Sequence, residues 1–124
     1  MRIQTFRVEI IIDTTHRESV RYRLLDNLNI LGYHAPAGFV TDGASVPRIF
    51  WGFLPPVDEY FPAAAVHDYL LSFDRENRDF ADRAFLECLR EIGVSVTVRE
   101  ALYRSVRLYS ALRRIKKFLM SRSR

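Results

Sequence analysis

The sequence predicts an α+β fold, in which an N-terminal antiparallel β-meander is followed by about three α-helices and one short helix. Residues 6–12 and 19–25 alternate between apolar and polar side chains, which is the period of a half-buried strand. From Ser45 onward the apolar residues recur at helical spacing instead. Strands that come first along a chain, with helices after them, are typical of α+β domains.

The strands are expected to begin with a hairpin. Residues 6–12 and 19–25 each place apolar side chains on one face, and residues 13–16 between them read as a turn. Asp26-Asn27 is a second turn. Residues 28–33 and 37–41 supply one or two further strands, which Gly32 and Pro36 interrupt.

Four helical segments are expected after the strands. Ser45 can cap a short helix at 47–54, which has Pro47 in its first turn and stops at Pro55-Pro56. Longer helices are predicted at about 59–73, at 78–92 with a stop at Gly93, and from about 95–97 to Met120. The last helix is expected to bury one stripe, formed by Val98, Leu102, Tyr109 and Leu112.

The chain of 124 residues is the size of one domain, predicted at 1–112, with a basic helical extension at 113–124. Residues 99–124 carry nine Arg or Lys and one acid, whereas residues 1–98 carry ten basic and fourteen acidic residues. No run of about 18 apolar residues predicts a membrane span. The alternating N-terminus does not resemble a signal peptide, so localisation in a host cytoplasm or in a virion is expected. The single cysteine, Cys88, sits at helical spacing among apolar residues and is expected to be buried.

His67 is the first candidate for chemistry. Its i±3 and i±4 neighbours are all apolar, so the imidazole should be largely buried and should need hydrogen-bond partners for its ring nitrogens. The connection at 74–77 is short, which favours antiparallel packing of the helices at 59–73 and 78–92. Asp82 can then approach His67 or Asp68, and a carboxylate behind an imidazole raises its basicity, as a general base requires.

A loop supplies the second part of the site. Thr41-Asp42-Gly43-Ala44-Ser45 leaves a strand and enters a helix, and Asp42-Gly43 permits a tight turn. Thr41, Asp42, Gly43, Ser45 and Asp68 are therefore binding candidates. Asp42 with Asp68 could ligate a divalent cation such as calcium or magnesium, or the backbone N–H groups could receive an anion.

Each of these residues also has a purely structural interpretation. Asp42 could form and cap the turn, and His67 could be a satisfied core histidine. Asp82 could pair with Arg78 or Arg83, and Asp68 could bond to the loop. One buried polar network would account for all of them without catalysis.

The motifs resemble a family of small phage and prophage proteins of unknown function. The resemblance rests on residues 39–47, which include Phe39, Thr41-Asp42-Gly43-Ala44-Ser45 and Pro47, then on His67-Asp68-Tyr69-Leu70, and then on Ala81-Asp82 with Phe85. It implies a phage or prophage origin, with a virion or host protein as partner, and no known activity.

The His67-Asp68 helix is also similar, more loosely, to the His-Asp helix of phospholipase A2. That resemblance implies His67 as the base for water, Asp68 as a metal ligand and Asp82 as the acid that orients His67. The chain departs from that family because it lacks its cysteines and has one glycine in the loop.

Three functions remain open on the sequence alone. The first is a phage accessory protein in which the polar residues form a structural latch. The second is a metal-assisted or His-based hydrolase of an ester, amide or phosphodiester. The third is a binder of an anionic membrane or of nucleic acid through the basic C-terminal helix. The oligomeric state is left open.

Overall fold

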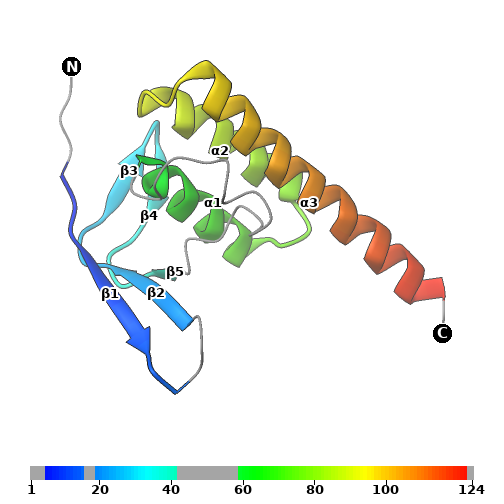
Figure 1. Cartoon of the computed structure of the whole chain (residues 1–124), viewed down its shortest axis with the longest axis horizontal. Coiled ribbons are helices and arrows are strands. Elements are labelled where there is room, and N and C mark those ends of the chain that lie inside the picture. The colour runs from blue at the N-terminus through cyan, green and yellow to red at the C-terminus, as the bar shows by residue number, and fades with distance from the viewer. Residues whose placement is uncertain (1–4, 16–18, 42–58, 123–124) are drawn as a thin grey trace.

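The computed structural model describes residues 5–15, 19–41 and 59–122. The predicted short helix at 47–54, its cap Ser45, and Asp42, Gly43 and His16 lie outside these residues. In the described part the strands precede the helices, which confirms the α+β prediction (Figure 1).

The sheet built by β1 (Val8–Asp13), β2 (Ser19–Leu24) and β5 (Val40–Thr41) is antiparallel, in the order β1-β2-β5. The expected hairpin of β1 and β2 is confirmed, with Val8 opposite Leu24. Thr41 pairs with Tyr22, so β5 lies alongside the inner end of β2. This register places Thr41, which is buried, beside the helices.

A separate hairpin replaces the expected strand at 28–33. Leu28–Ile30 (β3) pairs with Tyr33–Ala35 (β4). The turn between them uses left-handed backbone at Leu31, with φ 54°, and at Gly32, with φ 83°. Glycine adopts that conformation readily, so the interruption expected at Gly32 is confirmed. Leucine rarely adopts it, so the residue type does not indicate the left-handed backbone at Leu31.

The prediction of a half-buried face along the first hairpin is correct only for the inner end of the hairpin. Val8 and Tyr22 pack against the core and Leu24 is fully buried. Ile10 is 62% exposed and Val20 is 40% exposed. The reason is visible in Figure 1, where the outer end of β1 and β2 extends beyond the helices that cover the inner end.

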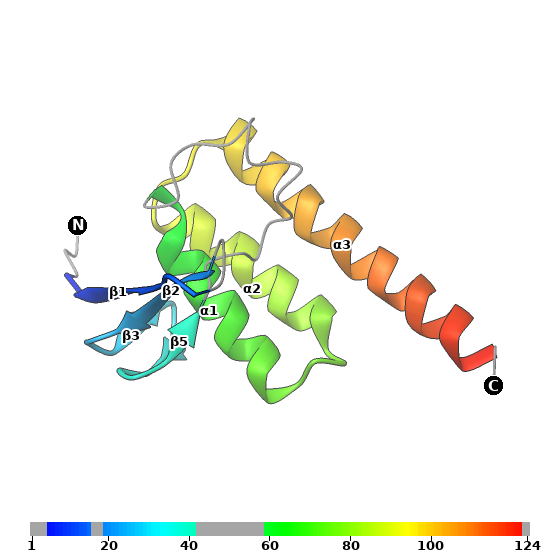
Figure 2. The same ribbon diagram turned by 60° about the horizontal axis from the view of Figure 1, so that its bottom comes forward.

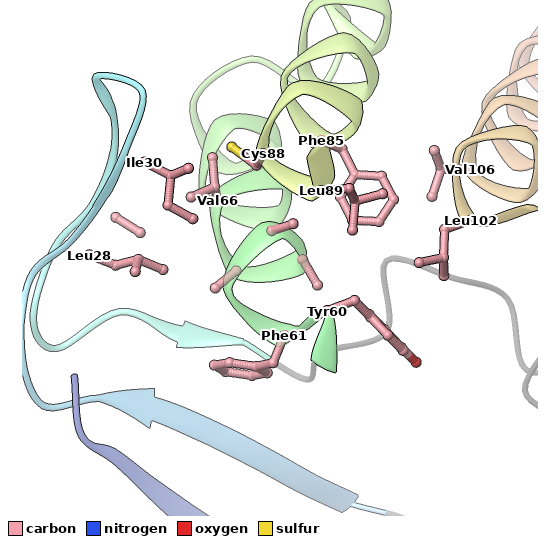
Figure 3. Packing of buried hydrophobic residues seen from close by; sticks show 14 of the residues in the cluster. Leu28, Ile30, Tyr60, Phe61, Val66, Phe85, Cys88, Leu89, Leu102 and Val106 are labelled. Atoms are coloured by element: carbon pink, nitrogen blue, oxygen red, sulfur yellow. The ribbon is translucent and has the colours of Figure 1, made fainter. Parts of the chain in front are cut away.

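The central helix is α1 (Phe61–Phe73), which has a proline in its first turn. Residues 63–66 are Ala-Ala-Ala-Val and are all 0% exposed. Small side chains allow neighbouring elements to approach closely, so α1 is covered by the strands and by α2 (Arg78–Glu91) at once. Figure 3 shows Val66 of α1 beside Cys88 of α2, within a core that also holds Leu28, Ile30 and Phe85.

The α2 helix begins at an Asn77 cap and is followed by Gly93 at φ 88°, the stop expected from the sequence. The α3 helix (Val96–Arg122) then crosses α2 and continues past it (Figures 1 and 2). Its buried residues are Leu102, Ser105, Val106 and Ser110. The predicted stripe was wrong at Tyr109 and Leu112, which are 39% and 54% exposed, because α3 leaves the domain near Ser110.

Candidate functional site

His67 lies on α1 and is 1% exposed, as its apolar neighbours predicted. Its Nε2 is 2.6 Å from Asp82 Oδ1, and Asp82 on α2 is 0% exposed. The expected contact between the two antiparallel helices is thus confirmed. The His67 ring also packs on Phe85, with 5.2 Å between the ring centroids, so the imidazole is held from one edge and one face.

Asp82 receives more partners than the sequence suggested. Its second carboxylate oxygen, Oδ2, accepts hydrogen bonds from Ser110 Oγ at 2.7 Å and from Arg107 Nη1 at 3.0 Å, both on α3. Ser110 in turn accepts a bond from Arg78 Nε at 2.8 Å. Asp82 therefore ties α1, α2 and α3 together, and its ion pair is with Arg107 rather than with Arg78 or Arg83.

These donors decide the protonation of Asp82. Burial alone would raise the pKa of its carboxyl, because a buried charge loses hydration. The hydrogen bonds from His67 and Ser110, together with the electrostatic attraction of His67 and Arg107, outweigh burial and hold the pKa of Asp82 below its ordinary value. Asp82 is consequently a carboxylate, which can only accept, so His67 Nε2 donates the proton between them.

The other nitrogen of His67 is in a different situation. Within the described residues, Nδ1 is buried without a hydrogen-bond partner, and Asp68 Oδ1 is 3.9 Å away. With the proton of a neutral ring on Nε2, Nδ1 carries a lone pair. Buried polar atoms without a hydrogen-bond partner are uncommon in folded proteins, so this nitrogen is a candidate for a functional role.

Asp68 lies near that nitrogen, and Thr41 is bonded to Asp68. Thr41 Oγ1 donates a short hydrogen bond to Asp68 Oδ2, which joins β5 to α1. The Asp68 side chain is 20% exposed, so it is the most accessible acid near His67 among the described residues. The predicted contact of Asp68 with the Thr41-Asp42-Gly43-Ala44-Ser45 segment falls partly outside the described residues, but Thr41, which ends β5, makes such a bond.

A pocket of about 610 Å³ opens beside this group and is lined by His67, Asp68 and Thr41. Nε2 is taken by Asp82, whereas Nδ1 lies 3.9 Å from the carboxylate of Asp68, which lines the same pocket. The remaining lining includes two aromatic residues, Phe39 and Tyr109. It also includes four arginines, which are Arg21, Arg75, Arg78 and Arg113.

Sequence reasoning placed His67 with Asp82 and missed the arginines of the pocket and the α3 residues of the network. The missed signal was a pair of serines, Ser105 and Ser110, on the buried side of α3. A serine in an apolar stripe must satisfy its hydroxyl. Ser105 bonds to its own helix at Leu102, whereas Ser110 reaches across to Asp82.

Metal ligation remains a prediction. Among the described residues no group of three or more His, Cys, Asp or Glu side chains is arranged to hold an ion. Asp42, the proposed second ligand beside Asp68, is outside them. Cys88 is buried, as expected, and burial raises the pKa of its thiol to about 12, so it is no nucleophile in the folded protein.

A family model described as a protein of unknown function (DUF1353) matches residues 17–106. The chain belongs to this family. The match includes Thr41, His67, Asp68 and Asp82 and ends one residue before Arg107. In the described part of this DUF1353 chain, no helix is long and apolar enough to cross a membrane.

One curated relative is an uncharacterized protein, y4jT, of Sinorhizobium fredii (strain NBRC 101917 / NGR234). The two are 31% identical over 86 residues, which is 68% of this chain and 26% of the relative. This DUF1353 chain thus spans about a quarter of the length of that protein. No solved structure matches the present chain significantly.

Proposed function

We propose that this DUF1353 domain is a His-based hydrolase whose base is Nδ1 of His67. The observation that carries the proposal is the unequal state of the two ring nitrogens. Asp82 holds Nε2 at 2.6 Å, while Nδ1 is buried, without a partner among the described residues, beside a pocket. A fixed tautomer with a free lone pair is what general-base catalysis requires.

The proposed step is hydrolysis of an ester bond. A water held near Nδ1 gives its proton to that nitrogen as its oxygen attacks the electrophilic atom of the substrate. The bond to the leaving oxygen then breaks, and that oxygen takes the proton back from the imidazolium. Asp82 positions the ring and stabilises its positive charge, as a buried carboxylate does behind a catalytic histidine.

The pocket favours an anionic substrate. Its described lining contains four arginines and one acid, Asp68, whose Oδ2 already accepts a bond from Thr41. Arginine is suited to carboxylate and phosphate groups because its planar fork of donors binds two oxygens at once. Among the ester, amide and phosphodiester substrates open on the sequence, the phosphodiester fits this lining best.

The test uses bis-p-nitrophenyl phosphate and p-nitrophenyl acetate as chromogenic probes. We expect the phosphodiester to be cleaved, and His67→Gln to lower the rate by about 100-fold or more, the usual size of a general-base effect. Glutamine keeps an amide donor near Asp82 but offers no base, so it protects the fold. His34→Ala is the matched control, because His34 is exposed on β4 and lies outside the pocket.

A wild-type protein that is folded but cleaves neither probe would contradict the proposal, as would an undiminished rate in His67→Gln. The same assay in EDTA, and with added calcium or magnesium, tests the cation predicted at Asp42 and Asp68. A bound cation should also raise the melting temperature by mass action.

The phage or prophage origin is a second proposal, supported by the three spaced motifs around Thr41, His67 and Asp82. It makes the protein a small accessory component that acts with a virion or host protein, and the buried network of Asp82 would then be a structural latch. Mass spectrometry of purified virions from a host that carries the gene tests it. Loss of folding in every His67 variant, with no activity in the wild type, would favour the latch.

A further inference from the structure

The arginine pocket does not end at the site. A second pocket of about 780 Å³ lies between the turn after α1 and the last turns of α3, and it shares Arg75, Arg78 and Arg113 with the first. Arg114, Lys116 and Lys117 extend its basic lining. Because they share three lining residues, the two pockets adjoin each other, and we call them together the basic groove.

Part of the basic groove is held in place before any ligand binds. Arg78 donates to Ser110 and lies 5.3 Å from the centre of the Tyr109 ring, and Arg113 lies 6.0 Å from the same ring. Ordered arginines lose little conformational freedom on binding. Tyr109 and Phe39 add aromatic faces to the lining.

The acids near the groove are already occupied. Both carboxylate oxygens of Glu76 accept from Lys117, at 2.6 and 2.7 Å, and Asp79 accepts from Arg107 and Arg114. The pKa values of both carboxyls are lowered by these partners, so both acids are ionised and paired. Arg75, Arg78 and Arg113 make no ion pair among the described residues, which leaves the middle of the groove positively charged.

We propose that the basic groove binds single-stranded nucleic acid and leads its backbone to His67. A basic groove that tracks a phosphate backbone, with aromatic side chains on which bases can stack, is the usual design of single-strand binding surfaces. The groove is far larger than one phosphate needs. The choice of a phosphodiester as substrate rests on the proposed hydrolase, but the binding itself does not.

The geometry of α3 argues against a membrane as the occupant of the groove. The exposed apolar residues Leu108, Leu112, Ile115 and Leu119 form a stripe at helical spacing. At about 100° per residue, this stripe lies roughly 150° around the helix from the side that lines the groove. A bilayer that received the stripe would leave the groove facing away from it.

The experiment measures fluorescence anisotropy of a labelled oligothymidylate of about a dozen nucleotides, within the usual site size for such surfaces. The test variant is Arg75→Gln with Arg113→Gln. The matched control is Arg90→Gln with Arg104→Gln, because both of those arginines are exposed and line neither pocket. Melting temperatures check that all proteins are folded.

We expect the wild type to bind with an affinity that falls steeply with salt, and the test variant to bind about 10-fold more weakly or worse at low salt. The slope of log affinity against log salt should drop by about 0.7 for each lost phosphate contact. The control pair should bind like the wild type.

Three results would overturn the inference: no binding by the wild type, an equal loss in the control pair, or binding to phosphatidylglycerol vesicles but not to the oligonucleotide. Tight binding with no cleavage would instead refute only the proposed hydrolase. Cleavage of bis-p-nitrophenyl phosphate without oligonucleotide binding would refute only this inference.

Discussion

The two edges of the His67 ring lie in regions of opposite character. Around Nε2, Asp82 is fully buried and both of its oxygens are bonded, to His67 on one side and to Ser110 and Arg107 on the other. Around Nδ1, the acid is the partly exposed Asp68, and an arginine-lined pocket adjoins the ring. The first region joins three helices, whereas the second connects one helix to one strand and opens outward.

This difference separates stability from chemistry within one side chain. Substitution within a fully hydrogen-bonded buried ionic network lowers stability strongly. Removing one partner leaves the other buried groups without a hydrogen bond, and no water can replace it. A partly open site tolerates substitution, because water can replace a lost contact. Mutations in the two regions should therefore differ first in their effect on folding and only then in their effect on function.

The largest effect is expected from Asp82→Ala. It leaves the Ser110 hydroxyl and the His67 Nε2 donor buried without their acceptor, and it removes the charge that Arg107 faces, so the free energy of unfolding should fall by about 3–5 kcal/mol. Asp68→Ala removes the bond to Thr41 from a partly exposed site and should cost about 1 kcal/mol. Urea denaturation followed by circular dichroism measures both. Equal losses would mean that the two regions do not differ as the contacts indicate.

A smaller effect should separate two arginines of α3 that share one partner. Arg107 and Arg114 both donate to Asp79, but only Arg107 also reaches the buried Asp82. Arg107→Ala should therefore lower the free energy of unfolding by about 1–3 kcal/mol, the range for a bond to a charged buried group. Arg114→Ala loses an exposed ion pair and should change stability little. If Arg114→Ala proves as destabilising, the bond to Asp82 is not what stabilises α3.

The contact between His67 and Asp82 could be predicted because it depends on short-range rules. Helical spacing places His67 among buried apolar residues, and a short turn makes α1 and α2 antiparallel. Two buried polar side chains at the same height on adjacent helices are then expected to form a hydrogen bond with each other. The α3 part of the network could not be predicted in this way. Which face of a long helix is buried depends on where the domain beneath it ends, and that end is near Ser110 rather than near Leu112.

The strands show the same limit. Alternation located β1 and β2 correctly, but it cannot tell how far a hairpin extends past the helices that cover it, so the exposure of Ile10 and Val20 was not foreseen. The turn at Leu31 depends on a left-handed leucine, for which the residue type gives no sign. Local patterns therefore predicted the elements and the central pair, and the extent of tertiary contact decided the rest.

The smallest expected effect is a difference in acid sensitivity between wild type and Asp82→Asn. Because the folded state lowers the pKa of Asp82 below 3.8, the ionised group contributes stability that is fully present well above that pH. This contribution is lost as the pH falls through the lower folded value. Asparagine has no such contribution to lose, so the gap between the two melting temperatures should narrow as the pH falls below about 4.

Other carboxyls with lowered pKa values, such as Asp26, Glu76 and Asp79, lose stability in acid in both proteins and cancel in this difference. Thermal unfolding at a series of pH values between 6 and about 2.5 measures the gap. A gap that stays constant over the whole range would mean that Asp82 titrates alike in the folded and unfolded chain. In that case the bonds from His67 and Ser110 would do no more than offset the cost of burying the carboxylate, and the fixed orientation of His67 would have to come from packing against Phe85 instead.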